Sequence, residues 1–245
     1  MKHQTVLCVC RSEATRHAGN CLADMGLHVI RKGAPDVTDI LLPVPSFPSS
    51  EEYLAHILAD VPEDVMISGG NLSSPLLRNY TTVDFLKDPY YLAENAAITA
   101  ACVKKIVLQE SGSSIHNCRL LILGWGRIGK CLCQLFDKEG FDITVAVRKD
   151  TDRAMIGALG WCGVSISEAA AEIERYDVII NTVPEMILPN VHAKQGALLL
   201  ELASKPGMSG ENIINCRGLP SKMAPIESGQ LIAKTFVRLC HRSEG

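Results

Sequence analysis

The sequence predicts an α/β protein made of two doubly wound domains with parallel sheets, joined by a long helix. Two observations carry this prediction. Apolar runs of strand length alternate with longer helix-like stretches along the whole chain, an order that is typical of βαβ units and parallel sheets. The length of 245 residues suits one large α/β domain or two small ones that share a cleft.

The composition indicates a folded protein and argues against nucleic-acid and membrane partners. The chain is 47% hydrophobic and 21% charged, so it can bury a sizeable core. Its net charge is −3, and no basic run is present that would follow a phosphate backbone. The apolar stretches are shorter than a membrane span, and the first residues lack the apolar core of a signal peptide. We therefore expect a cytoplasmic protein.

The ten cysteines do not form a metal or disulfide pattern. They are spread from Cys8 to Cys240 in two C-x-C pairs and six single positions, without any C-x-x-C. On a helix, Cys131 and Cys133 would point apart, which suits a single metal ion poorly. We expect reduced thiols that are mostly buried, and no metal site.

The first half of the chain is expected to hold five strands and three helices. The strands are bounded by turn residues and the helices are longer and more polar. The expected strands span 6–10, 28–31, 39–44, 65–69 and 82–85, and the expected helices span 12–25, 51–60 and 73–79.

Two loops of this half are predicted to bind substrate, because ligands of parallel sheets gather beyond the carboxyl ends of the strands. Pro43, Pro45 and Pro48 end the third strand, and a polar glycine-containing segment ends the fourth. The predicted substrate ligands are Ser46, Ser68, Gly69, Gly70 and Asn71.

A long helix over residues 89–110 is expected to cross from the first domain to the second. Pro89 suits the first helical position, and Asp88 suits the N-cap before it. We place the boundary at residues 112–117. This gives a flavodoxin-like or Rossmann-like substrate domain over residues 1–112, on which the final helix 224–241 could pack, and a nucleotide domain over 113–245.

The second half repeats the alternation, with a glycine-rich turn after its first strand. The expected strands span 119–123, 142–148, 177–183, 197–203 and 212–216, and the expected helices span 127–139, 150–159, 167–174 and 224–241. The turn has the form G-x-G-x-x-G, follows an apolar strand and opens a helix, which is the context of a Rossmann dinucleotide site.

Each glycine of this turn has a predicted role. Gly124 permits the tight turn, Gly126 lets a pyrophosphate approach the backbone, and Gly129 lets the helix pack close to the sheet. The helix N-terminus then offers free N–H groups to the phosphates. The predicted cofactor-binding residues of the turn are Gly124, Trp125, Gly126, Arg127, Ile128 and Gly129.

The second strand of this unit favours NADP, with NAD as the alternative. NAD enzymes place an acid at the tip of this strand to bond the ribose 2′-hydroxyl, whereas here the strand ends in Arg148 and Lys149. Arg148 can reach a 2′-phosphate, with Lys149 as a nearby point charge. The other reading is a solvated turn whose Arg148 only pairs with Asp150 or Asp152.

Two further strand tips are predicted to flank the nicotinamide and its ribose. Both are buried apolar strands that end in polar residues and a proline, at the same sheet edge as the glycine turn. Their predicted cofactor-binding residues are Asn181, Thr182, Val183, Pro184 and Ala203. Ser204 and Lys205 follow as the preferred catalytic or carboxylate-binding candidates, and Glu94 is a further candidate acid or base.

At these segments the chain resembles the A subunit of dipicolinate synthase. The distinctive segments are 181–188, 202–207 and 218–225, and the segments 40–44, 68–71 and 227–233 also fit. The resemblance implies an NADP-dependent oxidoreductase subunit of a spore former, acting in the mother cell during sporulation. It would form pyridine-2,6-dicarboxylate from a dihydro- or hydroxytetrahydro-pyridine dicarboxylate, together with a flavoprotein-like B subunit.

One departure from the family pattern raises a second hypothesis. Where the resemblance implies a Pro-Thr-x-Glu-Gly segment on the long helix, this chain has Ala101 at the glutamate position. The alternative is therefore a nucleotide-binding paralogue of weak or no activity that acts as a sensor or partner subunit. A third reading, another two-domain dehydrogenase or an S-adenosylhomocysteine-hydrolase-like enzyme, would require a catalytic histidine after a strand, and none stands there. A homodimer is a further expectation.

Overall fold

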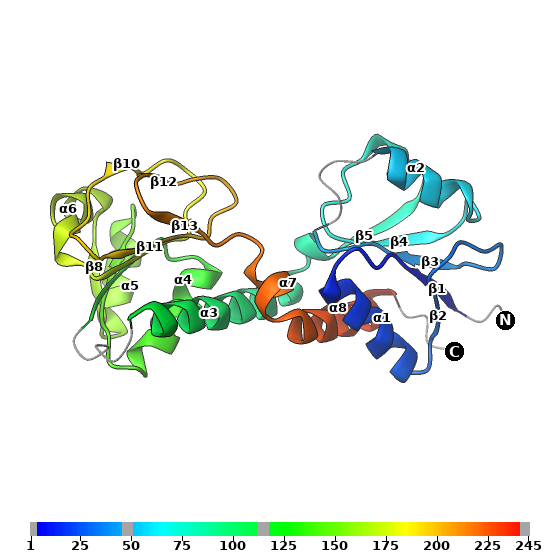
Figure 1. The fold of residues 1–245 in the computed structure, drawn as a ribbon, viewed down its shortest axis with the longest axis horizontal. Coiled ribbons are helices and arrows are strands. Elements are labelled where there is room, and N and C mark those ends of the chain that lie inside the picture. Colours follow the sequence, from blue (N-terminus) through cyan, green and yellow to red (C-terminus); the bar gives the residue numbers. More distant parts are fainter. Residues whose placement is uncertain (1–3, 46–50, 112–117, 241–245) are drawn as a thin grey trace. The chain divides into compact units, whose positions relative to one another are not determined.

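The computed structural model describes residues 4–45, 51–111 and 118–240. The chain separates into two compact units, one formed by residues 1–95 with 220–245 and the other by residues 96–219. Each unit holds a parallel sheet flanked by helices (Figure 1). The predicted α/β class with two parallel sheets is confirmed.

The first unit contains a five-stranded sheet with the order β2-β1-β3-β4-β5, in which all neighbours are parallel. This is the flavodoxin-like order, with its change of direction between β1 and β3. The strands are β1 (Thr5–Cys8), β2 (His28–Ile30), β3 (Asp39–Leu41), β4 (Met66–Gly69) and β5 (Thr81–Asp84).

Helices of the first unit pack closely on one another. Helix α1 (Glu13–Asp24) begins at Ser12, whose hydroxyl accepts a hydrogen bond from the Thr15 backbone N–H at 3.1 Å. Helix α8 (Pro225–Cys240) lies beside α1 (Figure 1). A Cβ added at Gly229 of α8 would lie 2.7 Å from the Ala14 carbonyl oxygen. Glycine at this position therefore permits the close approach of the two helices.

The first unit has further short helical segments, and it also contains the start of a long helix that continues into the second unit. They are α2 (Glu51–Ala59), the 3₁₀ turns η1 (Pro75–Leu77) and η2 (Phe85–Lys87), and α3 (Pro89–Ser111). Helix α3 starts in the first unit and continues into the second, since the units divide between residues 95 and 96. The Asp88 carboxylate accepts from the Tyr91 backbone N–H at 2.7 Å and pairs with Arg238 of α8, which fixes the start of α3.

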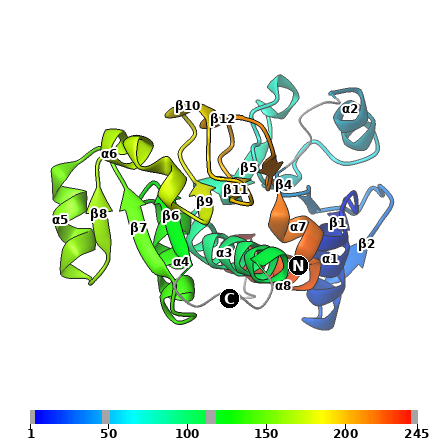
Figure 2. The ribbon, with the colours of Figure 1, turned by 60° about the vertical axis from the view of Figure 1, so that its left-hand side comes forward.

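The second unit contains a six-stranded parallel sheet with the order β13-β11-β9-β6-β7-β8. In sequence order these strands run 6-5-4-1-2-3, which is the order of the Rossmann fold. They are β6 (Arg119–Leu123), β7 (Asp142–Ala146), β8 (Cys162–Val164), β9 (Val178–Asn181), β11 (Leu198–Glu201) and β13 (Ile213–Asn215). Figure 2 shows β6, β7 and β8 side by side.

Helices and a small second sheet complete this unit. The sheet pairs β10 (Leu188–Val191) with β12 (Met208–Gly210) in parallel. The helical segments are α4 (Arg127–Asp137), α5 (Asp150–Ala158), α6 (Ile166–Ala171) and η3 (Ile173–Arg175). Helix α7 (Leu219–Met223) starts at the last residue of this unit and continues in the first unit. Strands β6 and β9 are almost fully buried, as expected for central strands of a parallel sheet covered on both faces.

Some predicted boundaries differ from those of the structure. Strands β8, β10 and β12 and helix α7 were not predicted, since each is five residues or fewer and lacks a clear period. The strand expected over 177–183 ends at Asn181, because the Asn181 side chain bonds both the N–H and the carbonyl of Val183 at 3.0 Å and turns the chain. The compact units divide after residues 95 and 219 instead of within 112–117, because residues 96–111 of α3 belong to the second unit.

Candidate functional site

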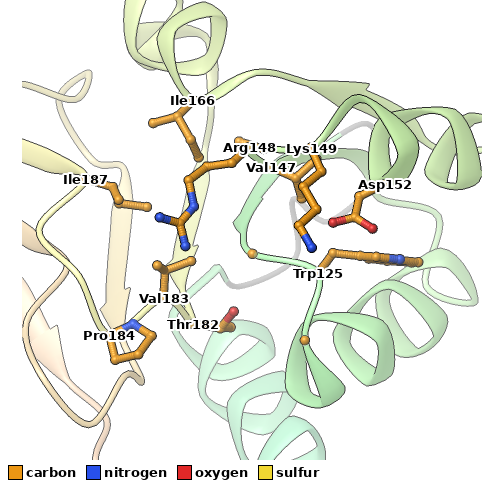
Figure 3. Close-up of a pocket in the computed structure, with 13 residues that line it drawn as sticks. Trp125, Val147, Arg148, Lys149, Asp152, Ile166, Thr182, Val183, Pro184 and Ile187 are labelled. Atoms are coloured by element: carbon orange, nitrogen blue, oxygen red, sulfur yellow. The ribbon is translucent and has the colours of Figure 1, made fainter.

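A pocket of about 270 Å³ lies in the second unit, at the carboxyl ends of β6, β7 and β9 (Figure 3). Strands β6 and β9 are parallel neighbours in space but do not follow one another in the sequence. Successive strands are therefore added to the sheet on one side of β6 and then, from β9 onward, on the other side. Ligands of open α/β sheets bind at this kind of position. The lining residues are Gly124, Trp125, Gly126, Ala146, Val147, Arg148, Lys149, Asp152, Ile166, Thr182, Val183, Pro184 and Ile187.

The three glycines of the turn have different surroundings. Gly124 has φ +101°, and a Cβ there would lie 2.6 Å from the Thr182 hydroxyl oxygen. A Cβ at Gly129 would lie 2.3 Å from the Gly124 carbonyl oxygen, whereas a Cβ at Gly126 would meet nothing within 4 Å. The first and third glycines thus permit close contacts that a side chain would prevent. The second faces open space beside the pocket.

Gly126 is also the N-cap of α4, and no side chain caps the helix. Its backbone is extended, with φ −81° and ψ −170°. The first-turn N–H groups of a helix have no partner within the helix, and together with the helix dipole they favour an anion. This end of α4 and the open space at Gly126 fit a phosphate group.

Trp125 lines the pocket, and Trp161 packs against it from outside the lining. The ring of Trp125 meets that of Trp161 edge-on, with 5.8 Å between centroids, and the Lys130 ammonium lies 5.6 Å from the Trp125 centroid. Trp161 donates from Nε1 to Asp137 at 3.1 Å. These are the two tryptophans of the chain, so the intrinsic fluorescence of the protein reports on this pocket.

The tip of β7 brings two cations to the pocket. In Figure 3 the Arg148 side chain extends across the pocket toward Val183, and the Lys149 side chain turns toward Trp125. The Arg148 guanidinium donates to the Glu185 carboxylate at 2.7 Å, and both side chains are more than half exposed. The pairing considered from the sequence, with Asp150 or Asp152, is wrong, since Arg148 reaches across to the β9 loop. Asp150 pairs instead with Arg153.

A buried carboxylate that the sequence analysis did not single out connects the tips of β9 and β11. Glu201 is 4% exposed and accepts from the Asn181 side-chain amide at 2.8 Å. It also accepts from the backbone N–H groups of Ala203, Gly207 and Met208 at 2.8–3.1 Å. The available signal was an acid inside the otherwise apolar strand expected over 197–203.

The other candidates of the second unit lie near this tip or on the surface. Asn181 and Ala203 are buried behind the pocket wall, whereas Ser204 and Lys205 are exposed and are not among the pocket-lining residues. Of the glycine-turn residues, Arg127 is exposed, Ile128 is half-buried and Gly129 is buried in the packing of α4. The structure thus brings together eight of the predicted cofactor residues and places the others around them.

The candidates of the first unit form no comparable cluster among the described residues. Ser68 is fully buried and donates to the Ile40 carbonyl at 3.1 Å, and a Cβ at Gly70 would lie 2.7 Å from the Val44 side chain. The Asn71 backbone N–H donates to Asp84 at 3.0 Å.

Three residues named from the sequence remain. A Cβ at Gly69 would lie 2.9 Å from the Leu42 side chain. Glu94 forms an exposed ion pair with Lys234 at 2.7 Å. Ser46 lies outside the described residues.

The cysteines are free thiols at all ten positions, and six of them are buried. Burial raises the pKa of Cys118 to about 11 and those of Cys133 and Cys240 to about 12. Within residues 4–45, 51–111 and 118–240, no three or more His, Cys, Asp or Glu side chains gather in a way that could hold a metal ion. No helix in the same ranges has the length and apolar character needed to span a membrane.

Comparison with known proteins gives a consistent family resemblance, although no family model matches the chain. The A subunit of dipicolinate synthase from Bacillus subtilis (strain 168) is 28% identical over 145 residues, which cover 55% of this chain. The match spans 49% of that relative, so it covers about half the relative's length.

Two solved structures share the fold over nearly the whole chain. The A subunit of dipicolinate synthase from Bacillus halodurans has a TM-score of 0.84 at 22% identity and covers 97% of this chain and 98% of its own. The A chain of Bacillus subtilis dipicolinate synthase has a TM-score of 0.78 at 20% identity, with coverages of 98% and 96%. The chain is therefore a relative of the dipicolinate synthase A subunit in sequence, and it has the fold of the solved dipicolinate synthase A chains.

Proposed function

We propose that the pocket of the second unit binds NADP and that the chain is the oxidoreductase subunit of a dipicolinate synthase. One observation carries the proposal: the glycine turn, the cationic tip of β7 and the tip of β9 meet at a single pocket where the sheet changes direction. The relationship to the dipicolinate synthase A subunit supports the reaction class.

The residues present fit a dinucleotide with a 2′-phosphate. Gly126 leaves open space and the start of α4 lacks a side-chain cap, which suits a pyrophosphate. Arg148 and Lys149 supply the positive charge for a 2′-phosphate.

Arg148 must exchange its present partner to serve this purpose. Its pair with Glu185 is exposed, and exposed pairs contribute only about 0.2–1 kcal/mol. A doubly hydrogen-bonded phosphate is the stronger partner, so the exchange is favourable. Asp152 also lines the pocket, and its carboxylate is the feature that would suit the ribose hydroxyl of NAD instead.

The proposed substrate is a dihydro- or hydroxytetrahydro-pyridine dicarboxylate. Oxidation of a dihydro ring releases one hydride and one proton, and the hydroxylated ring must also lose water. When bound, NADP would accept the hydride. The chain's own part is to hold the dinucleotide through the glycine turn and the β7 tip, and to offer Ser204 and Lys205, exposed after β11, to the substrate carboxylates.

The same proposal implies a partner subunit and the cell in which the protein acts. The Bacillus subtilis relative is named as one subunit of its enzyme. We therefore propose a flavoprotein-like B subunit as partner, action in the mother cell, and assembly as a homodimer.

Titration with nucleotides tests the cofactor, because both tryptophans stand at or beside the pocket wall. We expect NADPH to quench the fluorescence with a Kd about tenfold lower than that of NADH, as the 2′-phosphate adds a charged contact. Equal or tighter NADH binding would refute the NADP assignment. Activity is then followed by the absorbance of the aromatic product, after this chain and the B subunit are mixed with the dihydropyridine dicarboxylate and NADP.

A second function is favoured by one residue of α3. Ala101 is exposed on this helix, where the family resemblance implies a glutamate. If that carboxylate is needed for turnover, this chain binds NADP without reacting and acts as a sensor or partner subunit. Tight NADPH binding without product in the presence of the B subunit, together with product formation by Ala101→Glu, would favour this second function.

A further inference from the structure

We propose that Glu201 is a positioning residue that fixes the nicotinamide half of the dinucleotide site. The inference rests on the proposed function and adds to it, because Glu201 does not line the pocket. Its carboxylate is buried at the end of β11, next to the end of β9.

The carboxylate is held entirely by neutral donors of the two strand tips. One oxygen accepts from the Asn181 amide at 2.8 Å and the Ala203 backbone N–H at 3.0 Å. The other accepts from the Gly207 and Met208 backbone N–H groups at 2.8 and 3.1 Å, and from the Asn181 amide at 3.0 Å. Hydrogen bonds to an ionised acceptor are about twice as strong as neutral ones, so this one side chain fixes the loop 202–208.

The same carboxylate reaches the pocket wall through Asn181. The Asn181 amide donates to the Val183 carbonyl at 3.0 Å, and its oxygen accepts from the Val183 N–H at 3.0 Å. Val183 and its neighbours Thr182 and Pro184 line the pocket. Glu201 therefore orients Asn181, and Asn181 sets the backbone of the wall.

The two loops are also in close contact with each other. The Gly207 carbonyl accepts from the Ile187 backbone N–H at 2.9 Å. A Cβ at Gly207 would lie 2.3 Å from the Asn181 amide nitrogen and 2.5 Å from the Val183 carbonyl oxygen. A loss of the Glu201 anchor is therefore expected to move both loops together.

The other half of the site is built from different elements. The glycine turn and the β7 tip form no hydrogen bond with Glu201 among the described residues. In a Rossmann sheet the adenosine half lies by the glycine turn and the second strand, and the far half lies by the fourth and fifth strands. Here β9 and β11 are the fourth and fifth strands, which places the nicotinamide half over the tips that Glu201 fixes.

Two nucleotides separate this role from a general effect on folding. Glu201→Gln turns an acceptor oxygen into an amide donor that faces the N–H donors around it. We expect it to raise the Kd of NADPH about tenfold or more, and to leave the Kd of adenosine 2′,5′-bisphosphate, which lacks the nicotinamide half, within about twofold. Both values are measured by quenching of tryptophan fluorescence, below the unfolding temperature.

Asp177→Asn is the matched control. Asp177 precedes β9 at the opposite edge of the same sheet, and its carboxylate accepts from the Arg119 backbone N–H at 2.8 Å and pairs with Lys194. This variant is expected to lower the melting temperature while leaving both nucleotide affinities within about twofold. Should Glu201→Gln fail to fold, Asn181→Ala replaces it. Glu201 then keeps its three backbone donors, while the connection from Glu201 through Asn181 to Val183 is lost.

The outcomes are distinct. Selective loss of NADPH affinity supports the inference. Unchanged NADPH affinity, or an equal loss for both nucleotides, overturns it and leaves Glu201 with a structural role alone. A wild-type chain that binds neither NADPH nor NADH refutes the proposed function itself, before any variant is compared.

Discussion

Two alanine substitutions in the glycine turn should separate folding from cofactor binding. In Gly126→Ala the added methyl meets nothing within 4 Å, and in Gly129→Ala it lies 2.3 Å from the Gly124 carbonyl oxygen. The same chemical change is thus made three residues apart in one turn. The first methyl enters the space assigned to the pyrophosphate, and the second enters the packing of α4 against the turn.

The expected magnitudes follow from these distances. Real Cβ contacts are essentially never shorter than 3.0 Å, so α4 and the turn must separate by about 0.7 Å in Gly129→Ala. The obstructing atom is backbone and cannot rotate away. Overpacking of this kind costs about 1–3 kcal/mol, offset by about 1 kcal/mol of helix propensity. A net loss of about 1 kcal/mol lowers the Tm by about 2–4 °C in a chain of this size.

For Gly126→Ala we expect almost no change in stability. Its φ of −81° is open to alanine. The weaker N-cap costs about 0.5–1 kcal/mol, and the reduced freedom of the unfolded chain returns about as much. The Kd for NADPH should nevertheless rise about tenfold or more, because the pyrophosphate can no longer approach the backbone.

Thermal unfolding and fluorescence titration of the two variants test both statements. A folded Gly126→Ala that binds NADPH as tightly as the wild type would show that no pyrophosphate lies against this residue. A Gly129→Ala that melts at the wild-type temperature would show that the close packing of turn and helix does not need glycine.

Three further predictions concern charge and thiols. Arg148→Ala should weaken NADPH about tenfold and NADH less than about twofold, as measured by fluorescence titration, since only the 2′-phosphate needs the guanidinium; equal losses would contradict its role. Burial raises the pKa of Asp88, but hydrogen bonds from Arg238 and the Tyr91 backbone outweigh it and lower the pKa below 3.8. The stability that Asp88 contributes is then present at neutral pH and is lost as the pH falls through the lowered pKa, so urea unfolding should show Asp88→Asn less stable than wild type at pH 7, and this difference should shrink as the pH is lowered below 3.8. Of the ten thiols, Cys10 and Cys162 are exposed, so a thiol reagent should label these two first in the native protein and all ten after denaturation; early labelling of a buried thiol would contradict this burial.

Local patterns in the sequence were sufficient for the strands of the two large sheets, apart from β8, and for the centre of the pocket. The apolar runs of β6 and β9 predict buried parallel strands because both faces of such strands are covered. The spacing of Gly124, Gly126 and Gly129 predicts the turn because two of its requirements are local: Gly124 adopts a positive φ, and Gly129 packs against the Gly124 carbonyl. Such short-range constraints can be recognised without the rest of the chain.

Contacts between distant residues could be obtained only from the tertiary structure. Arg148 and Glu185 lie 37 positions apart, and Asn181 and Glu201 lie 20 apart. Each pair meets because parallel strands deliver their carboxyl ends to one edge of the sheet, and the sequence does not state which side chains will face each other there. The short strands β10 and β12 were missed for a related reason, since they exist through pairing with one another.

By itself the sequence determined the fold class, the position of the glycine turn and the resemblance to the dipicolinate synthase A subunit, because these depend on residue types at fixed local spacings. Only the tertiary structure decided that residues 96–111 belong to the second unit and that Glu201 fastens two loops of the site. The physical reason is that a buried carboxylate forms hydrogen bonds with the donors that the fold brings within about 3 Å of it. The strand order determines which donors these are.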